Sequence, residues 1–257
     1  MKNLLIGAVS GNYSPSDLSG WVETSNFDGV ERVLLLYNNN DNLLSDYLIK
    51  NNIRVLCPDF GFFAEYNNFF ETNTGNNTLE NSYNLIHNIR FFHIWNYLNN
   101  TESEYDKVII TDIKDVYFND NPFNDLEDNK LTATSELIIY QNEAWNKEHL
   151  CVNLGLIGVS KLFDKPVYNV GVFGGDKKLV QDICADIYLL SVGKPKVADQ
   201  TSFNYLIQTQ YKEVTNFTEN LAIHLHVVNA GLVDISLDKI PSYKIVHQYD
   251  RIPGYKR

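Results

Sequence analysis

The sequence predicts an α/β fold in which helices pack on a mostly parallel central sheet. Three apolar segments, residues 4–9, 32–37 and 53–57, lack the alternation of a half-exposed strand, which is typical of strands buried on both faces. Amphipathic segments lie between them, one carrying Leu18, Trp21 and Val22 and one around residues 43–48. This order of strands and helices implies parallel pairing through right-handed crossovers.

The remaining segments continue the alternation. Ser14 or Ser16 is suited to cap the first helix, with Pro15 in its first turn. A turn is expected at 38–41, and the aromatic cluster at 60–70 is either a small core under a loop or a mobile flap or acceptor surface. We predict helices at 83–98, 142–150, 177–192 and 199–209, and strands at 108–111, 131–135, 167–175 (ending in a glycine turn), 223–228 and 245–247.

Composition narrows the possible partners. The 257 residues are expected to form a single domain, 1–257, because no linker-like segment divides them. A net charge of -11 argues against nucleic acid or an anionic membrane surface as the main partner. An anionic substrate would therefore need a local cation.

The cysteines and the N-terminus predict a cytoplasmic location. Cys57, Cys151 and Cys184 are odd in number and far apart, so they indicate reduced thiols and no disulfide framework. The apolar run at residues 4–9 is too short for a membrane span and lacks the features of a signal peptide.

Two carboxylates follow the buried strand at 108–111. Asp112 and Asp115 come at its carboxyl end, where open α/β sheets bind ligands. Hard oxygen ligands suit Mg²⁺ or Mn²⁺ carrying a phosphorylated substrate. The alternative is that both carboxylates cap local N–H groups in a turn.

Five segments in one order resemble the nucleotide-diphospho-sugar transferases of the GT-A type. They are residues 112–123, 135–136, 169–175, 198–204 and 246–251. The resemblance spans nearly the whole chain. It implies a three-layer α/β/α domain that transfers a sugar, as a hexosyltransferase does, from a nucleotide diphosphate donor to a hydroxyl of a glycan, protein or small molecule. It also implies Mn²⁺ or Mg²⁺ as cofactor and a UDP-sugar in preference to a GDP-sugar.

The resemblance assigns the metal ligands. Asp115 matches the last carboxylate of the family's acidic motif, and Asp112 would share the metal or lie near the ribose. His247 matches a late histidine that completes the metal shell. The usual pair is Asp-x-Asp, and Ile113 stands here at the first of those positions.

The resemblance also places residues around the donor. Asn169 and Gly171 would lie beside the sugar, and Asp199 and Gln200 would form the floor of the same cleft, with Asp199 as a sugar-contacting or catalytic carboxylate. Arg90 would reach the nucleotide or pair with a carboxylate. By position in the first strand-to-helix loop, Ser10 and Asn12 would touch the base and ribose. His87, His93, His149, His224 and His226 are interpreted as structural.

The stereochemistry and two rival functions stay open at this level. Inversion needs a carboxylate base, for which Glu136, Asp199 and Asp250 are candidates, whereas retention could use the leaving phosphate. One rival is a sugar nucleotidyltransferase, although residues 10–13 do not supply its glycine- and lysine-rich loop. The other is a noncatalytic nucleotide or sugar binder with a decayed acidic motif.

Overall fold

The structure, a computed structural model, describes residues 2–37, 42–58 and 79–255, with side chains from residue 86 onward in the last range. The turn expected at 38–41 and the aromatic segment at 60–70 lie outside the described residues. Within the described part, seven strands form the main sheet: β1 (Lys2–Ser10), β2 (Val30–Tyr37), β3 (Arg54–Leu56), β4 (Tyr105–Thr111), β6 (Leu131–Ile139), β7 (Pro166–Asp176) and β8 (Thr215–Thr218).

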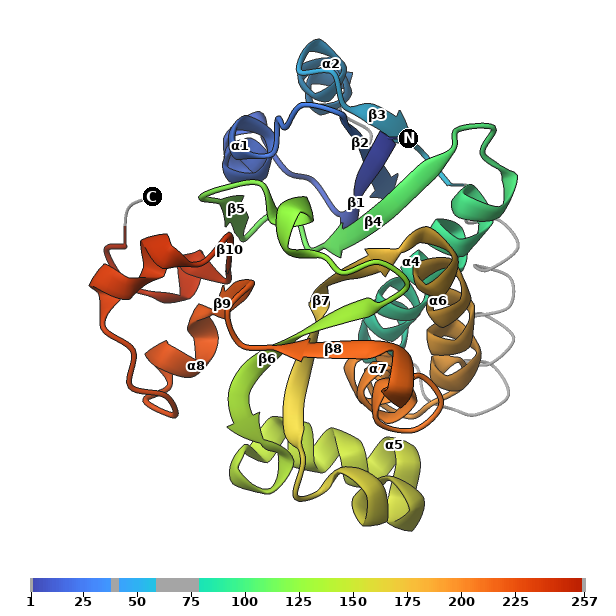
Figure 1. The fold of residues 1–257 in the computed structure, drawn as a ribbon, viewed down its shortest axis with the longest axis vertical. Helices are drawn as coiled ribbons and strands as arrows, with labels where there is room; N and C mark the ends of the chain where they lie inside the picture. Colours follow the sequence, from blue (N-terminus) through green and yellow to red (C-terminus); the bar gives the residue numbers. More distant parts are fainter. Residues whose placement is uncertain (1, 38–41, 59–78, 256–257) are drawn as a thin grey trace.

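The main sheet is mostly parallel, as expected. Its strand order is β3-β2-β1-β4-β7-β6-β8, and β7 alone runs antiparallel to its neighbours β4 and β6. A second sheet, of order β5-β10-β9, is formed by β5 (Val116–Phe118), β9 (Ala222–His224) and β10 (Ile245–His247). It joins the chain after β4 to the C-terminal segment, which Figure 1 shows as a group with α8 (Leu225–Asn229).

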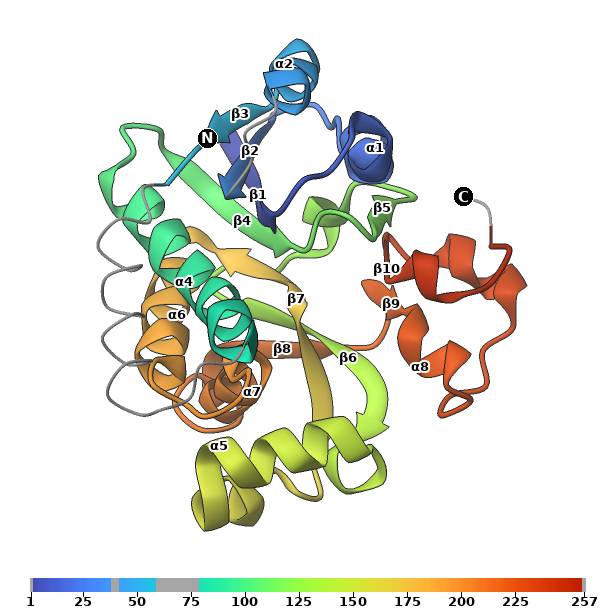
Figure 2. The same cartoon turned by 180° about the vertical axis from the view of Figure 1, so that it is seen from behind.

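Helices cover both faces of the main sheet. One core cluster joins the sheet to α4 (Leu79–Asn100), α6 (Lys177–Ser191) and α7 (Asp199–Gln208), which Figure 2 shows together on one side. A second cluster joins the opposite face to α1 (Pro15–Thr24), α2 (Asn42–Lys50) and the small sheet. In β1, Leu4 and Ile6 belong to the first cluster and Leu5, between them, belongs to the second. Both faces of the strand are therefore covered, and all three side chains are fully buried.

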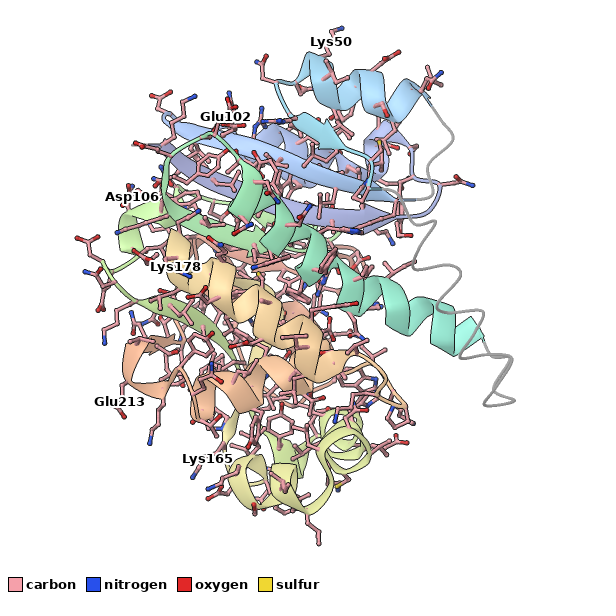
Figure 3. The ribbon with its side chains drawn as sticks, turned by 90° about the vertical axis from the view of Figure 1, so that its right-hand side faces the viewer. Lys50, Glu102, Asp106, Lys165, Lys178 and Glu213 are labelled. Atoms are coloured by element: carbon pink, nitrogen blue, oxygen red, sulfur yellow. The ribbon has the colours of Figure 1, made fainter. Side chains whose placement is uncertain are left out.

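Exposed charges lie outside this packing. In Figure 3, Lys178 of α6 and Glu213 before β8 point away from the core, and both are exposed. Helix α5 (Ala144–Leu162) packs against α7 and carries a non-helical Gly155. Short 3₁₀ helices occupy Pro122–Asp125, Tyr140–Asn142, Lys212–Val214, Leu237–Ser242 and Tyr249–Arg251.

Several predicted boundaries were wrong. Gly174 and Gly175 do not form a turn but pair with β4 as part of β7. Glycine is needed there because an added Cβ would lie 2.6 Å from the Val108 carbonyl oxygen at Gly174 and 2.1 Å from that of Lys130 at Gly175. The strand expected at 223–228 ends at His224, where α8 begins, and α5 continues well past residue 150. The three-residue β5 and the four-residue β8 are too short to give a periodic signal.

The topology places a binding position between β1 and β4. The chain leaves β1 through α1 on one face and returns to β4 through α4 on the other face. At such a switch in strand order the loops diverge and leave a crevice at the carboxyl ends of the strands. No helix in the described residues combines the length and the apolar character needed to cross a membrane.

Candidate functional site

The end of β4 is fixed from two sides. Thr111, its last residue, accepts a hydrogen bond from Trp21 Nε1 of α1 at 2.9 Å. The next N–H, that of Asp112, donates to the carbonyl of Gly171 on β7 at 2.7 Å. Asp112 therefore starts from a defined backbone position at the crevice.

The residue after Asp112 explains the departure from Asp-x-Asp. Ile113 is 1% exposed and packs in the second core cluster. Its side chain fills the space over Gly7 of β1, where an added Cβ would lie 2.2 Å from Ile113 Cδ1. Ile113 is therefore a core residue. Asp112 and Asp115 instead converge across a spacing of three.

Asp112, Asp115 and His247 lie together, as predicted. Each offers one ligand atom, and these atoms lie within 4.8 Å of one another. His247 Nε2 is 3.3 Å from Asp112 Oδ2 and 3.8 Å from Asp115 Oδ1. This buried nitrogen has no well-aligned hydrogen-bond partner within the described part of the chain. Two carboxylates and a free imidazole nitrogen fit Mn²⁺ or Mg²⁺.

A chain of hydrogen bonds orients His247. The hydroxyl of Thr134 on β6 donates to the carbonyl of Val172 at 2.7 Å, so its oxygen accepts from His224 Nε2 at 3.1 Å. Burial lowers the pKa of His224, which is therefore neutral, and its Nδ1 is left as an acceptor. His247 Nδ1–H donates to it at 3.0 Å. Burial would lower the pKa of His247, but contact with Asp112 and the charge of Asp115 raise it. With Nδ1–H held by His224, it is Nε2 that faces the carboxylates and would bind a metal once deprotonated.

Arg90 connects the Asp112–Asp115–His247 cluster to α7. Its side chain, 8% exposed, donates from Nη1 to Asp112 Oδ1 at 2.5 Å and from Nη2 to Asp199 Oδ2 at 3.0 Å. Burial would raise the pKa of Asp112, but the Arg90 charge and then His247 hold it well below its usual value. Burial raises the pKa of Asp115. A bound cation would favour the charged form of both carboxylates.

Comparison with known proteins identifies the fold. No family model matches the sequence, and no curated protein matches it. Apo mouse xyloside xylosyltransferase 1 matches with a TM-score of 0.53 and 13% identity, over 96% of this chain and 97% of that chain. The apo glycosyltransferase GlyE of Streptococcus pneumoniae TIGR4 matches with a TM-score of 0.54 and 15% identity, over 96% of this chain and 54% of that chain.

This chain has a glycosyltransferase fold. The match to mouse xyloside xylosyltransferase 1 covers nearly all of both chains, whereas the chain spans about half the length of GlyE (54%). The α/β class and the mostly parallel central sheet expected from the GT-A resemblance are confirmed.

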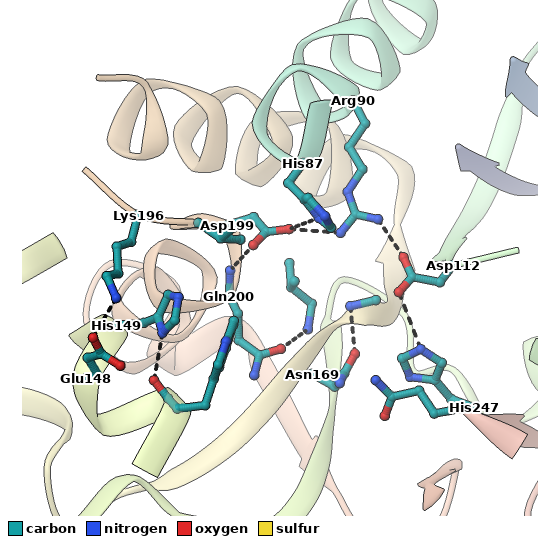
Figure 4. A pocket seen from close by; sticks show the side chains of 15 residues that line it. His87, Arg90, Asp112, Glu148, His149, Asn169, Lys196, Asp199, Gln200 and His247 are labelled. Atoms are coloured by element: carbon teal, nitrogen blue, oxygen red, sulfur yellow. Dashed lines mark hydrogen bonds and ion pairs between the residues drawn. The ribbon is translucent and has the colours of Figure 1, made fainter. Parts of the chain in front are cut away.

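In this glycosyltransferase fold, two pockets share the wall formed by Arg90 and Asp112. One, of about 410 Å³, lies over the end of β1 and is lined by Ser10, Tyr13 and Asp115, among others. The other, of about 590 Å³, extends from His247 past Asn169 and Asp199 toward α5. Figure 4 shows Asp112 and His247 at one end of the larger pocket and Asp199 and Gln200 between that end and Lys196.

Asn169 and Gln200 form a hydrogen-bond network below the larger pocket. Asn169 Nδ2 donates to Glu136 Oε1 at 2.6 Å, and Gln200 Nε2 donates to the same oxygen at 3.1 Å. Asn169 Oδ1 accepts from Gly171 N at 2.7 Å. Glu136 is 1% exposed and lines neither of the two pockets, whereas Asp199 lines the larger one.

The remaining predicted residues lie at the periphery. Ser10 lines the smaller pocket, but Asn12 is exposed and lines neither. Asp250 lines the smaller pocket, 3.7 Å from Lys114 Nζ. It therefore lies on the opposite side of the Asp112 wall from Asp199.

Sequence reasoning missed three histidines near the site. His87 Nδ1 lies 3.6 Å from Asp199 Oδ2, His226 Nε2 lies 3.5 Å from Glu136 Oε2, and His224 contacts His247. His224 and His226 flank the end of β9, a position that only the pairing of β9 with β10 reveals. The spacing of these histidines in the sequence matches no motif that would indicate a functional site.

Proposed function

We propose that this protein is a metal-dependent glycosyltransferase that moves a sugar from a nucleotide diphosphate to a hydroxyl acceptor. The observation that carries the proposal is the Asp112–Asp115–His247 cluster, at the wall between two pockets. The proposal places the nucleotide in the pocket at the end of β1. The sugar then enters the larger pocket beside Asp199 and Gln200.

The charge arrangement supports this donor class. The whole chain carries a net charge of -11, which repels a diphosphate. Arg90 supplies a buried positive charge at the shared wall, but it is already paired with Asp112 and Asp199. A Mn²⁺ or Mg²⁺ ion held by Asp112, Asp115 and His247 would supply the charge that neutralises the departing diphosphate.

Transfer would exchange one bond at the anomeric carbon. The acceptor oxygen forms the new bond, and the bond to the phosphate oxygen breaks with its electron pair leaving on the diphosphate. The hydroxyl proton passes to that phosphate or to solvent. Asp199, held by Arg90 and His87, would orient the donor sugar, and Asn169 and Gln200 would position the pocket floor over Glu136.

A thermal-shift panel tests the proposal. UDP- and GDP-linked hexoses would be compared with and without Mn²⁺, and we expect stabilisation by a donor only when the metal is present, with a UDP-sugar as the best ligand. Release of free nucleotide diphosphate in the same mixtures separates an enzyme from a noncatalytic binder. A panel in which no nucleotide sugar shifts the melting temperature would contradict the proposal.

Asp115→Ala should abolish the metal-dependent shift and leave the melting temperature of the apo protein nearly unchanged. Burial and the neighbouring Asp112 disfavour the charge of Asp115 in the apo protein, so its loss costs little stability there. Asp164→Ala, at a side chain that is 72% exposed, is the matched control and should keep the full shift. An unaltered shift in the Asp115 variant would remove Asp115 from the ligand set.

The cytoplasmic location and the single-domain organisation expected from the sequence stay predictions. Cell fractionation with an antibody to the chain tests the first. Limited proteolysis tests the second, because one domain should resist cleavage throughout residues 79–255.

A further inference from the structure

The larger pocket extends beyond the residues assigned to the donor. Its far end is lined by Trp145, Glu148 and His149 of α5 and by Lys196 and Val197 of the segment before α7. Figure 4 places Lys196, Glu148 and His149 at the end opposite Asp112 and His247, with Asp199 and Gln200 between them. A group bound at this far end would face the donor sugar.

Trp145 gives this end an aromatic surface. It is 46% exposed, which is unusual for the largest apolar side chain. The His149 ring stacks on it with centroids 3.8 Å apart and an interplanar angle of 26°, and His149 is itself 7% exposed. His149 Nδ1–H donates to the Trp145 carbonyl at 2.7 Å. The indole is therefore supported by His149 and still accessible.

The aromatic surface is rigidly connected to the pocket floor. Glu143, the N-cap of α5, accepts hydrogen bonds from the N–H groups of Trp145 at 3.0 Å and Asn146 at 2.6 Å. Asn146 Oδ1 accepts from Gln200 Nε2 at 2.9 Å, and Gln200 also binds Glu136. Trp145 is thus held in place before any ligand arrives, which lowers the entropic cost of binding.

The segment opposite Trp145 is also held on α5. Asn153 of α5 donates from Nδ2 to the Val197 carbonyl at 2.8 Å and accepts from the Lys196 N–H at 3.2 Å. Lys196 Nζ lies 2.5 Å from Glu148 Oε1, so the charges at this end are paired. Paired charges suit hydroxyl groups, which both donate and accept hydrogen bonds, better than they suit a charged ligand.

We propose that this end of the pocket is the acceptor subsite and that the acceptor is a carbohydrate. A pyranose has an apolar face of C–H groups that packs on an indole and a rim of hydroxyls that hydrogen-bond to groups such as Lys196 and Glu148. The inference rests on the proposed glycosyl transfer and names its acceptor class. The acceptor sugar lies on Trp145 with one hydroxyl directed at the donor sugar.

Binding of simple glycosides to the full chain tests the subsite without any donor. Methyl β-D-glucopyranoside, methyl β-D-galactopyranoside and methyl β-D-xylopyranoside would be titrated by saturation-transfer NMR and tryptophan fluorescence. D-Sorbitol, which has hydroxyls but no pyranose face, serves as the negative probe. We expect at least one glycoside to bind and Trp145→Ala to weaken it about tenfold, since an aromatic contact contributes about 0.5–1.5 kcal/mol beyond area burial.

Two variants control the measurement. Trp145→Phe keeps an aromatic face and should retain most of the affinity. Leu156→Ala, at an 87% exposed position of the same helix outside the pocket, should bind like the wild type. Equal glycoside affinity in Trp145→Ala and the wild type would overturn the inference, and so would sorbitol binding as tightly as the glycosides.

Separate experiments test the acceptor subsite and the proposed function, so that either one can fail without the other. Donor stabilisation by Mn²⁺ is measured without glycoside, and glycoside binding is measured without donor. When both succeed, Trp145→Ala should raise the KM of the glycoside in the transfer reaction about tenfold. Transfer to a serine or threonine peptide with no transfer to any glycoside would assign the subsite to a protein acceptor and overturn the inference.

Discussion

Two uncharged residues shape the candidate metal site. Ile113 packs over Gly7 in the core, so position 113 cannot present a carboxylate to the site, and Asp115 supplies the second one. Gly171 has no side chain where Asp112 lies: an added Cβ would come within 2.5 Å of Asp112 Oδ2 and 2.9 Å of Asn169 Oδ1. The site therefore needs a core isoleucine and a glycine as much as it needs its ligands.

Gly171→Ala should weaken Mn²⁺ binding about tenfold while the protein stays folded, because the new methyl group displaces the movable carboxylate of Asp112. Calorimetric titration of the apo protein with Mn²⁺ measures this. Gly174→Ala on the same strand is the contrast. Its methyl group meets the Val108 carbonyl at 2.6 Å, so it should lose about 1–3 kcal/mol of stability. Wild-type Mn²⁺ affinity in Gly171→Ala would contradict this account.

At the scale of elements, the site forms where two sheets meet. The turn between β4 and β5 supplies Asp112 and Asp115, whereas β10 of the small sheet supplies His247. β6 of the main sheet supplies Thr134, which reaches His247 through His224 of β9. The orientation of His247, a candidate metal ligand, thus depends on hydrogen bonds that cross between the sheets.

Thr134→Val should weaken Mn²⁺ binding about tenfold, because His224 loses the acceptor that sets its tautomer and no longer fixes the ring of His247. Thr132 is the matched control: it is buried on the same strand and its hydroxyl has no partner among the described residues. Thr132→Val should keep the wild-type affinity. Nitrogen-15 NMR of the histidine rings should show a proton on Nδ1 of His247 in the wild type. A pattern unchanged in Thr134→Val would disprove the relay.

The whole molecule is acidic and still buries several carboxylates. Burial alone would raise the pKa of Glu136, but contact with His226 and the hydrogen bonds from Asn169 and Gln200 hold it below its usual value. Burial and the charge of Glu136 in turn raise the pKa of Tyr140. A carboxylate with a lowered pKa adds stability above its unfolded pKa and loses that contribution as the pH falls through the folded pKa.

Glu136→Gln should therefore cost about 1–3 kcal/mol at pH 7, where Glu136 is ionised and hydrogen-bonded. The difference from the wild type should shrink as the pH falls below the usual range for a glutamate. Urea unfolding at several pH values measures both. A difference that stays constant from pH 7 to acid would show that the charge of Glu136 does not stabilise the fold.

Local sequence determined most elements and the chemistry of the ligands. Unbroken apolar strands, helical periodicity and the Ser14–Pro15 start of α1 are short-range signals, and the structure follows them. The order of motifs along the chain was enough to predict the fold and to single out Asp112, Asp115 and His247, which lie together in the structure. The elements depend on residues near one another in the chain, whereas the fold was predicted from the order of short motifs along it.

Only the tertiary structure decided which partners surround those ligands. Residues 90, 112 and 199 are joined through Arg90, and residues 134, 224 and 247 through hydrogen bonds, across separations that no local pattern encodes. The same holds for Trp145. No sequence pattern indicated a role for it, and it lines the pocket only because α5 packs against α7. Strand pairing and helix packing bring such residues together, because burial of the apolar core selects one arrangement of the elements.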